Sequence, residues 1–332
     1  MCIRDRYGTS DERKINMSDE KSKATLLKEE IMMKGSKGVA TLNAEEIKKA
    51  DDFCVGYKKF LDHSPVEREA VSYTLELAKK AGFTEYDENA SYNAGDKVYY
   101  VNRDKAIALA VIGKNGVKNG ARLAIAHIDS PRIDLKPNPL YEDTNLALFK
   151  THYYGGLKKY QWTALPLSLH GTVVKLDGTK ENITWGDDEN ESCFCVTDLL
   201  PHLAKDQVSK PLAKVFTGED LNVLVGSRPY EDGNDEKDLV KLNVMSILNK
   251  KYGIVEGDFL SAELCLIPSF KARDIGFDAS MIGGYGHDDK VCAYPAVMAS
   301  LDVETPEQTC VTYLTDKEET GLSLIHISEP TR

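Results

Sequence analysis

Apolar residues recur at helical spacing in two stretches in the first quarter of the chain. From Asn43 onward they form one stripe, and Asn43 can cap a helix whose first turn carries Glu45 and Glu46. The stripe comprises Ile47, Ala50, Phe53, Cys54, Tyr57 and Leu61. The sequence SPVE at residues 64–67 predicts a second helix, which begins with a capping box and ends at Gly82.

The next stretches are short apolar runs that are separated by polar turns. They cover residues 97–101, 106–113 and 121–130. Within 106–112 and 123–126 apolar and polar residues do not alternate, which predicts strands that are buried on both faces of a sheet. Helices followed by buried strands predict an α/β layered domain.

The pattern changes after Ser130, where proline and asparagine become frequent and short strands and turns follow. An amphipathic helix is predicted at about 239–252, and apolar strand-like sequence resumes at 259–270. A loop then enters a helix despite Pro295, and a last buried strand ends in acidic residues. We therefore predict a disordered or foreign lead-in at 1–40, an α/β domain at 41–130 plus 271–321, a β-rich insertion at 131–270 and a foreign tail at 322–332.

Composition excludes several classes of protein. The formal net charge is -11 without a basic run, so binding to nucleic acid is not expected. No apolar run approaches the ~20 residues of a membrane span. The 7 cysteines are odd in number and none forms a Cys-x-x-Cys pair, which favours a reducing, cytoplasmic location.

Two residues at the end of a predicted strand are candidates for a metal site. His127 and Asp129 are two positions apart in the sequence AHIDSP, so their side chains project from the same face. Imidazole is a common metal ligand, and a carboxylate on its other ring nitrogen sets the tautomer. A hydrogen-bonded structural pair is the alternative.

Two acidic pairs extend this pattern. Asp288 and Asp289 follow a glycine-rich turn at the start of a helix, where capping is the structural alternative. Glu318 and Glu319 follow a buried strand, where a solvated turn is the alternative. Histidine together with several carboxylates is a ligand mixture for zinc, with cobalt or manganese as alternatives.

The motifs AHIDSP, YYGG with Trp162, TDLLPHLA, FLSAEL, GHDDKVCAY and DKEETG together resemble the M18 family of zinc aminopeptidases, the aspartyl aminopeptidase group. The resemblance runs from about Thr41 to Gly321. It implies a phosphorylase/hydrolase-like α/β catalytic domain that is interrupted by a β-rich dimerisation domain. It also implies peptide substrates and a homo-oligomer, a dimer that can assemble further into a dodecamer.

The resemblance further implies a role for each site residue. His127 is similar to a ligand of one zinc ion, Asp288 to a carboxylate that bridges two, and Glu319 to a ligand of the other. Glu318 resembles the general base and Asp129 the carboxylate that clamps the imidazole. The peptide bond between Asp288 and Asp289 is expected to be cis. Tyr153, Gly155 and Gly156 are expected to serve only the turn.

Two departures from the family pattern matter. His202 lies near the position of histidines that reach a neighbouring subunit, but Asp206 stands four residues further on, so the inter-subunit role of His202 is the weaker of two interpretations. The family also requires an Asp and a His after the glutamate pair, and only 13 residues follow Glu319. Among them, His326 lies in a tail that we do not expect to supply a ligand.

Both ends resemble translated sequencing-adapter read-through, namely MCIRDR and LSLIHISEPTR. We expect Met17 to be the native start and authentic sequence to end near Gly321. With three of five ligands, the 332-residue chain is predicted to bind zinc poorly and to be inactive. Appreciable aminopeptidase turnover by the purified chain would contradict this prediction.

Two other functions share these features. A non-catalytic assembly or binding protein could keep the fold after losing its metals, and a metallo-deacylase acting on small amides could use the same site chemistry. The first differs from an aminopeptidase in the missing ligands, and the second differs in its preference for N-acyl substrates.

Overall fold

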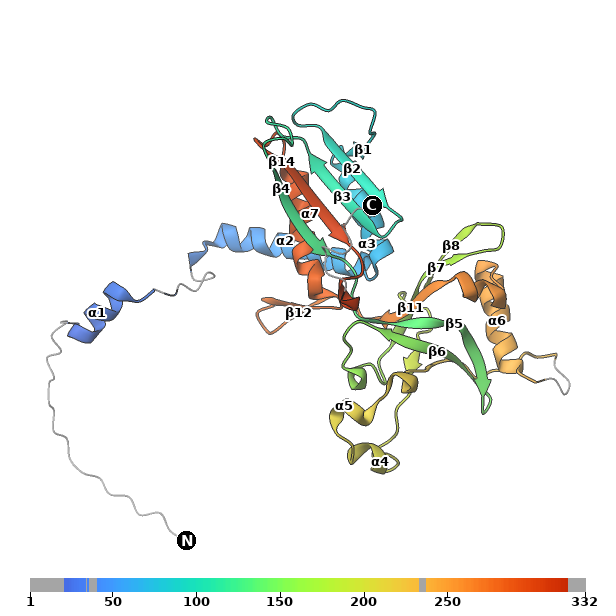
Figure 1. Cartoon of the computed structure of the whole chain (residues 1–332). Coiled ribbons are helices and arrows are strands. Elements are labelled where there is room, and N and C mark those ends of the chain that lie inside the picture. Colours follow the sequence, from blue (N-terminus) through green and yellow to red (C-terminus); the bar gives the residue numbers. More distant parts are fainter. Residues whose placement is uncertain (1–20, 34, 36–40, 233–236, 322–332) are drawn as a thin grey trace, which may run out of the picture. The chain divides into compact units, whose positions relative to one another are not determined.

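The computed structural model describes residues 21–33, 35, 41–232 and 237–321 (Figure 1). The two expected foreign tails, MCIRDR and 322–332, lie outside these residues. The chain divides into two compact units, residues 1–52 and 53–332. The first unit contains helix α1 (Lys23–Ile31), which is capped by Ser22, and the beginning of helix α2 (Ala44–His63). Asn43 caps α2 as predicted, because its Oδ1 accepts from the N–H groups of Glu45 and Glu46.

The second unit contains a five-stranded mixed sheet, the first sheet, in the order β1-β2-β3-β14-β4. Strands β14 and β4 run parallel, and β14 is antiparallel to β3. The strands are β1 (Thr84–Glu85), β2 (Lys97–Asn102), β3 (Ala106–Val111), β4 (Ala121–His127) and β14 (Thr309–Thr315).

Two helices cover one face of the first sheet, as Figure 1 shows for α7. They are α3 (Glu67–Lys80) and α7 (His287–Asp302), which continues through Pro295 as predicted. Leu109 and Leu314 from the sheet and Val297 from α7 pack in one core. This arrangement confirms the predicted α/β class.

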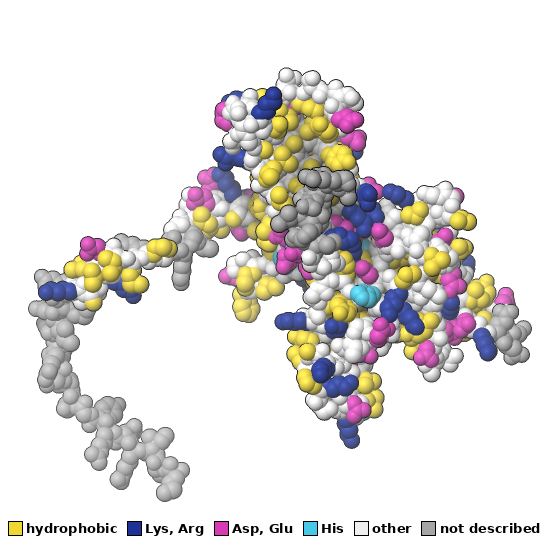
Figure 2. Space-filling model, viewed as in Figure 1, with side chains coloured by type: hydrophobic (Ala, Val, Ile, Leu, Met, Phe, Trp, Pro, Cys, Tyr) yellow, Lys and Arg dark blue, Asp and Glu magenta, His cyan; other side chains and the backbone are white. Residues whose placement is uncertain are grey.

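The opposite face of the first sheet is apolar but partly exposed. Leu123 and Ile125 of β4 are 66% and 45% exposed, and Figure 2 shows hydrophobic side chains gathered over this sheet. The prediction that β4 is buried on both faces is therefore wrong for the described residues. Strand β4 is the outermost strand of the sheet, and α7 packs on only one of its faces.

A seven-stranded sheet, the second sheet, has the order β8-β7-β11-β5-β6-β10-β9. Helix α6 (Leu239–Tyr252) packs on it, with the bounds that the sequence predicted. Phe149, Leu169 and Leu266 lie in its core with Leu248 of α6. The strands are β5 (Arg132–Asp143), β6 (Leu146–Tyr154), β7 (Leu167–Val174), β8 (Lys180–Trp185), β9 (Cys195–Val196), β10 (Val223–Gly226) and β11 (Glu263–Pro268).

The remaining elements are short. Strands β12 (Arg273–Ile275) and β13 (Met281–Gly283) form a hairpin, and helices α4 (Lys205–Val208) and α5 (Leu212–Val215) follow β9. No helix in the described part of the chain is both long and apolar enough to cross a membrane.

The beginning of α3 departs from the predicted capping box. The helix starts at Glu67 with Val66 as N-cap, and the Ser64 hydroxyl is buried without a hydrogen-bond partner. The Glu67 carboxylate does not return to Ser64, because it accepts instead from Arg132 at 2.7 Å. A long-range ion pair has replaced the local cap.

Each of the first three residues of α3 forms an ion pair with a different strand of the second sheet. We call these three ion pairs the junction pairs. Their partners come from three neighbouring strands, so the start of α3 is held against the sheet at three points. The pairs are Glu67 with Arg132 of β5 at 2.7 Å, Arg68 with Glu263 of β11 at 2.6 Å, and Glu69 with His170 of β7 at 2.9 Å.

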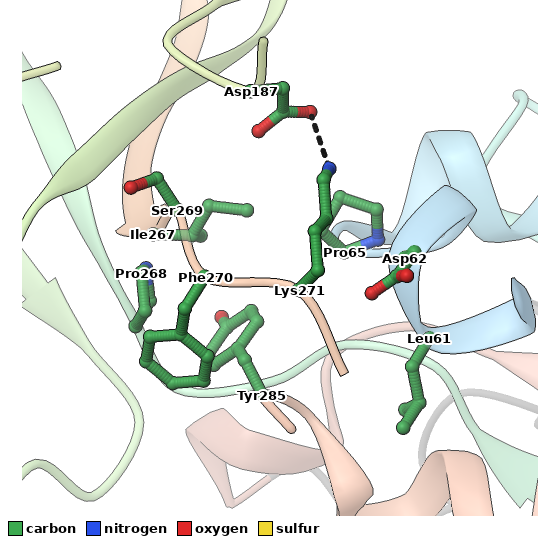
Figure 3. A pocket seen from close by; sticks show the side chains of 10 residues that line it. All are labelled: Leu61, Asp62, Pro65, Asp187, Ile267, Pro268, Ser269, Phe270, Lys271 and Tyr285. Atoms are coloured by element: carbon green, nitrogen blue, oxygen red, sulfur yellow. Dashed lines mark ion pairs between the residues drawn. The ribbon is translucent and has the colours of Figure 1, made fainter. Parts of the chain in front are cut away.

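A small cavity lies between the end of α2 and the segment after β11 (Figure 3). Leu61, Tyr285 and Phe270 line it, and Asp187 faces Lys271 across it at 3.9 Å. Its volume of about 20 Å³ holds a single water molecule. None of its lining residues belongs to the candidate metal site.

Candidate metal centre

The parallel pairing of β4 and β14 brings two candidate segments to one edge of the first sheet. His127 lies opposite Thr315 in the register, and the N–H of Ile128 donates to the carbonyl of Thr315 at 2.9 Å. Because parallel strands end at the same edge of a sheet, the segments that follow β4 and β14 begin at neighbouring points. Asp129 and the Glu318 turn therefore meet although 189 positions separate them.

The start of α7 brings a third segment to this edge. His127 Nε2 lies 3.2 Å from Asp288 Oδ1 and 3.6 Å from Glu318 Oε2. The Asp288 side chain is 86% exposed, so it is open to solvent. The Asp288–Asp289 peptide bond is cis, as the resemblance led us to expect.

Asp129 is the buried centre of the cluster, with 0% exposure. Its Oδ1 accepts from the N–H of Glu318 at 3.3 Å and lies 3.4 Å from His127 Nδ1, which also hydrogen-bonds with the main-chain carbonyl oxygen of Asp129 at 3.1 Å. Its Oδ2 accepts from the N–H of Glu319 at 3.1 Å and from the Tyr154 hydroxyl at 2.6 Å. One carboxylate thus contacts the imidazole and both amides of the glutamate turn.

These contacts shift the pKa values in opposite directions. Burial lowers the pKa of His127, but the hydrogen bonds and charge of Asp129, with a contribution from Glu318, raise it to about 9. Burial raises the pKa of Asp129, but hydrogen bonds from His127, Tyr154 and the Glu319 amide lower it to about 2. Asp129 is therefore a permanent anion beside the imidazole at neutral pH.

Glu319 is held in a space that a glycine leaves open. A Cβ added at Gly155 would lie 3.0 Å from Glu319 Oε2, and Gly155 has a φ of +72° that disfavours other residues. Burial raises the pKa of Glu319, and the charges of Asp129, Asp288 and Glu318 raise it further against the effect of His127. Gly155 thus makes room for a candidate ligand, beyond the turn role expected of it.

Two residues that sequence reasoning missed also support the site. The hydroxyl of Tyr154 reaches Asp129 from the second sheet, and the buried ammonium of Lys290 donates to Ser130 Oγ at 2.8 Å. Ser130 Oγ in turn donates to the carbonyl of Asp288 at 3.4 Å. Burial is the main cause that lowers the pKa of Lys290 to about 8. Both residues lie inside the motifs that carried the resemblance, which was the only available signal.

His202 does not join the cluster. It is exposed on a turn that ends at Leu203, before α4. The other five residues selected from the sequence lie together at the edge of the first sheet, joined by the contacts of Asp129 and His127.

The donor set fits zinc in chemical kind, because one imidazole and several carboxylates converge. The distances between them are those of hydrogen bonds and ion pairs. Over residues 21–33, 35, 41–232 and 237–321, no group of three or more His, Cys, Asp or Glu side chains has the arrangement that holds a metal ion.

Comparison with known proteins gives a consistent result. Residues 60–324 match the family model described as "Aminopeptidase I zinc metalloprotease (M18)". A Clostridium acetobutylicum protein named "Probable M18 family aminopeptidase 1" is 50% identical over 269 residues, which is 80% of this chain and 58% of the relative. The Thermotoga maritima protein of the same name is 44% identical over 269 residues, or 81% and 58%.

Solved structures agree in fold. The crystal structure of an M18 aminopeptidase from Thermotoga maritima matches with a TM-score of 0.81 at 42% identity, covering 87% of this chain and 62% of that one. Aminopeptidase I from Clostridium acetobutylicum matches with a TM-score of 0.76 at 44% identity, covering 84% and 62%. The chain thus spans 58% of the length of both curated relatives described above. On the family match over residues 60–324 and these identities, the chain belongs to the M18 family of zinc metallopeptidases.

Proposed function

We propose that the cluster at the edge of the first sheet is the metal site of an aminopeptidase, which removes N-terminal residues from peptides. His127, Asp288 and Glu319 would be ligands in a site for two zinc ions, with Asp288 shared between them. The observation that carries this proposal is the convergence of His127, Asp288 and Glu318 within 3.2–3.6 Å from three separate segments. Membership of a zinc metallopeptidase family supports it.

Each residue has a defined task in this proposal. Asp129 orients the imidazole of His127 through Nδ1 and leaves Nε2 directed at Asp288. Glu318 is the general base, which takes a proton from the attacking water and returns it to the leaving amine. Zinc, when bound, supplies Lewis acidity toward the scissile carbonyl. The half-exposed Glu318 carboxylate is accessible for this proton transfer.

For the 332-residue chain we propose that it is inactive. The resemblance calls for five ligands, and only three candidates converge among the described residues. A site with three ligands binds zinc more weakly than one with five, because each ligand contributes to the affinity.

The proposal extends to location and assembly. The six cysteines in the described residues are all free thiols, which supports a reducing, cytoplasmic location. We assign the first sheet with its helices to a catalytic domain at 41–130 plus 271–321, and the second sheet to a dimerisation domain at 131–270. A homo-oligomer built through the second domain follows from this assignment.

A zinc titration tests the site. Competition with a chromophoric chelator is measured for the wild-type chain, for His127→Ala and Glu319→Gln, and for Asp289→Asn as a matched control. We expect weak zinc binding by the wild type, no measurable binding by the first two variants and unchanged binding by the control. Equal zinc uptake by all four proteins would overturn the assignment of the ligands.

A substrate panel separates the alternative functions. Aminoacyl-nitroanilides and N-acyl amino acids are offered to this chain and to the Clostridium acetobutylicum relative, before and after chelation. The proposal expects nitroaniline release by the relative, its loss on chelation and no appreciable release by this chain. Preferential cleavage of N-acyl substrates would favour a deacylase, and inactivity of both proteins would favour an assembly protein.

A further inference from the structure

Tyr154 at the end of β6 belongs to the second sheet but binds a residue of the candidate metal site. Its hydroxyl donates to Asp129 Oδ2 at 2.6 Å, and the residue is only 7% exposed. It is the shortest hydrogen bond to the Asp129 carboxylate. A side chain from the second sheet therefore supplies a hydrogen-bond donor to a carboxylate at the edge of the first sheet.

The ring of Tyr154 is held by a stacked guanidinium. Arg132 lies directly opposite Tyr154 in the pairing of β5 with β6, and its Cζ is 4.1 Å from the ring centroid. Arg132 is itself fixed, because Nη1 donates to Glu67 Oε2 at 2.7 Å and Nε donates to Asp134 Oδ1 at 2.7 Å. The group that covers the Tyr154 ring is thus itself fixed by the junction pair between Glu67 and Arg132.

The Asp129 carboxylate transmits this position to the rest of the site. Its Oδ2 accepts from Tyr154 and from the Glu319 amide, while Oδ1 accepts from the Glu318 amide and contacts His127. Without the hydroxyl, Oδ2 would keep one donor, and rotation of the carboxylate would weaken its contacts with the glutamate turn. Hydrogen bonds to a charged acceptor are stronger than neutral ones, so the loss is substantial.

We propose that Tyr154 is a positioning residue for this site: it fixes the Asp129 carboxylate and, through it, the His127 imidazole and the Glu318–Glu319 turn. The second sheet thereby contributes to the geometry of a site that lies on the first sheet. The functional consequence rests on the proposed metal site, but the positioning effect is measurable without metal or substrate.

Hydrogen–deuterium exchange tests the positioning effect. Tyr154→Phe keeps the ring under Arg132 and removes only the hydroxyl, and Tyr153→Phe removes a hydroxyl from the adjacent, 38% exposed ring. We expect the Glu318 and Glu319 amides to exchange at least about tenfold faster in Tyr154→Phe. They should be unchanged in Tyr153→Phe, and the core of the second sheet should be unchanged in both variants.

A spectroscopic readout separates positioning from general stability. The ¹⁵N shifts of the His127 ring report its tautomer and hydrogen bonding, and we expect them to move in Tyr154→Phe and to stay unchanged in Tyr153→Phe. Arg132→Lys keeps a charge opposite Glu67 but loses the planar group over the ring, so it should give a smaller change of the same sign. This second variant tests the relay independently of the tyrosine.

Two results would overturn the inference. The first is unchanged exchange at Glu318 and Glu319 in Tyr154→Phe, and the second is faster exchange throughout the chain with unchanged His127 shifts. The outcome is also distinguishable from that of the proposed function. Suppose that the Glu318 and Glu319 amides exchange faster in Tyr154→Phe, but His127→Ala binds as much zinc as the wild type. That result would refute the metal site and support the positioning role.

Discussion

Arg132→Met is expected to lower the free energy of unfolding by about 3–5 kcal/mol. Glu67 and Arg132 are 4% and 6% exposed and their charged atoms are 2.7 Å apart. Removing the guanidinium would leave Glu67 as a buried charge whose other ion pair among the described residues is with Lys105, at 3.6 Å. Burial raises the pKa of Glu67, but Arg132 and Lys105 outweigh it and lower that pKa, so the carboxylate is ionised in the folded chain.

Urea denaturation measures this effect, and two further variants calibrate it. Lys80→Met removes the exposed partner of Glu76 on the same helix, and we expect it to change the free energy of unfolding far less than Arg132→Met does. The double variant Glu67→Met, Arg132→Met should recover much of the loss, because no unpaired charge stays buried. An Arg132→Met cost as small as that of Lys80→Met would contradict the prediction.

The stability of the chain should also fall between about pH 6.5 and pH 9 through His170. This imidazole has 0% exposure, with Nδ1 2.9 Å from Glu69 Oε1 and Nε2 3.1 Å from Asp187 Oδ1. Burial lowers its pKa, but the hydrogen bonds to Asp187 and Glu69 raise it to about 9, above the ordinary value of 6.5. The Ser168 hydroxyl and Lys271, which pairs with Asp187, complete the surroundings.

The sign follows from proton linkage. Because the folded state holds this proton more tightly than the unfolded state, the stabilisation is fully present below about pH 6.5 and is lost as pH rises through about 9. A pKa shift from 6.5 to about 9 corresponds to roughly 3–4 kcal/mol in total. His170 of β7 pairs with Glu69 of α3, so loss of the proton from His170 weakens one of the junction pairs.

Urea denaturation across this pH range checks the prediction. The difference in unfolding free energy between the wild type and His170→Gln should shrink by roughly 2–3 kcal/mol from pH 6.5 to pH 9. His202→Gln, at an exposed turn, should follow the wild type. Parallel curves for wild type and His170→Gln would show that His170 does not carry the pH dependence.

Local patterns were sufficient for much of the fold. The helical stripe predicted α2, the amphipathic run predicted α6 with its observed bounds, and Asn43 caps as expected. The capping box at Ser64 failed because Glu67 has a stronger partner 65 positions away. The prediction that β4 is buried on both faces failed because apolar content alone does not show which faces of a strand are covered.

Some features of the candidate site could likewise be predicted from local sequence, and others could not. The His127–Asp129 spacing at a strand end was readable locally, and the acidic pairs were visible as candidates, with their roles supplied by the resemblance. The roles of Tyr154 and Gly155 were not readable, because each depends on an atom contributed by another segment: the Asp129 carboxylate and the Glu319 carboxylate.

By itself, then, the sequence determined the α/β class, the longer helices α2, α3, α6 and α7, several strands, and the residues from which a metal site could be built. Those features follow from periodicity, caps and short spacings, which act over a few residues. Only the tertiary structure decided that Asp129 contacts His127 and the amides of Glu318 and Glu319, that Tyr154 reaches Asp129 from the second sheet with Arg132 over its ring, and that α3 is held by three ion pairs. Such contacts depend on the packing of segments far apart in sequence, which local patterns do not encode.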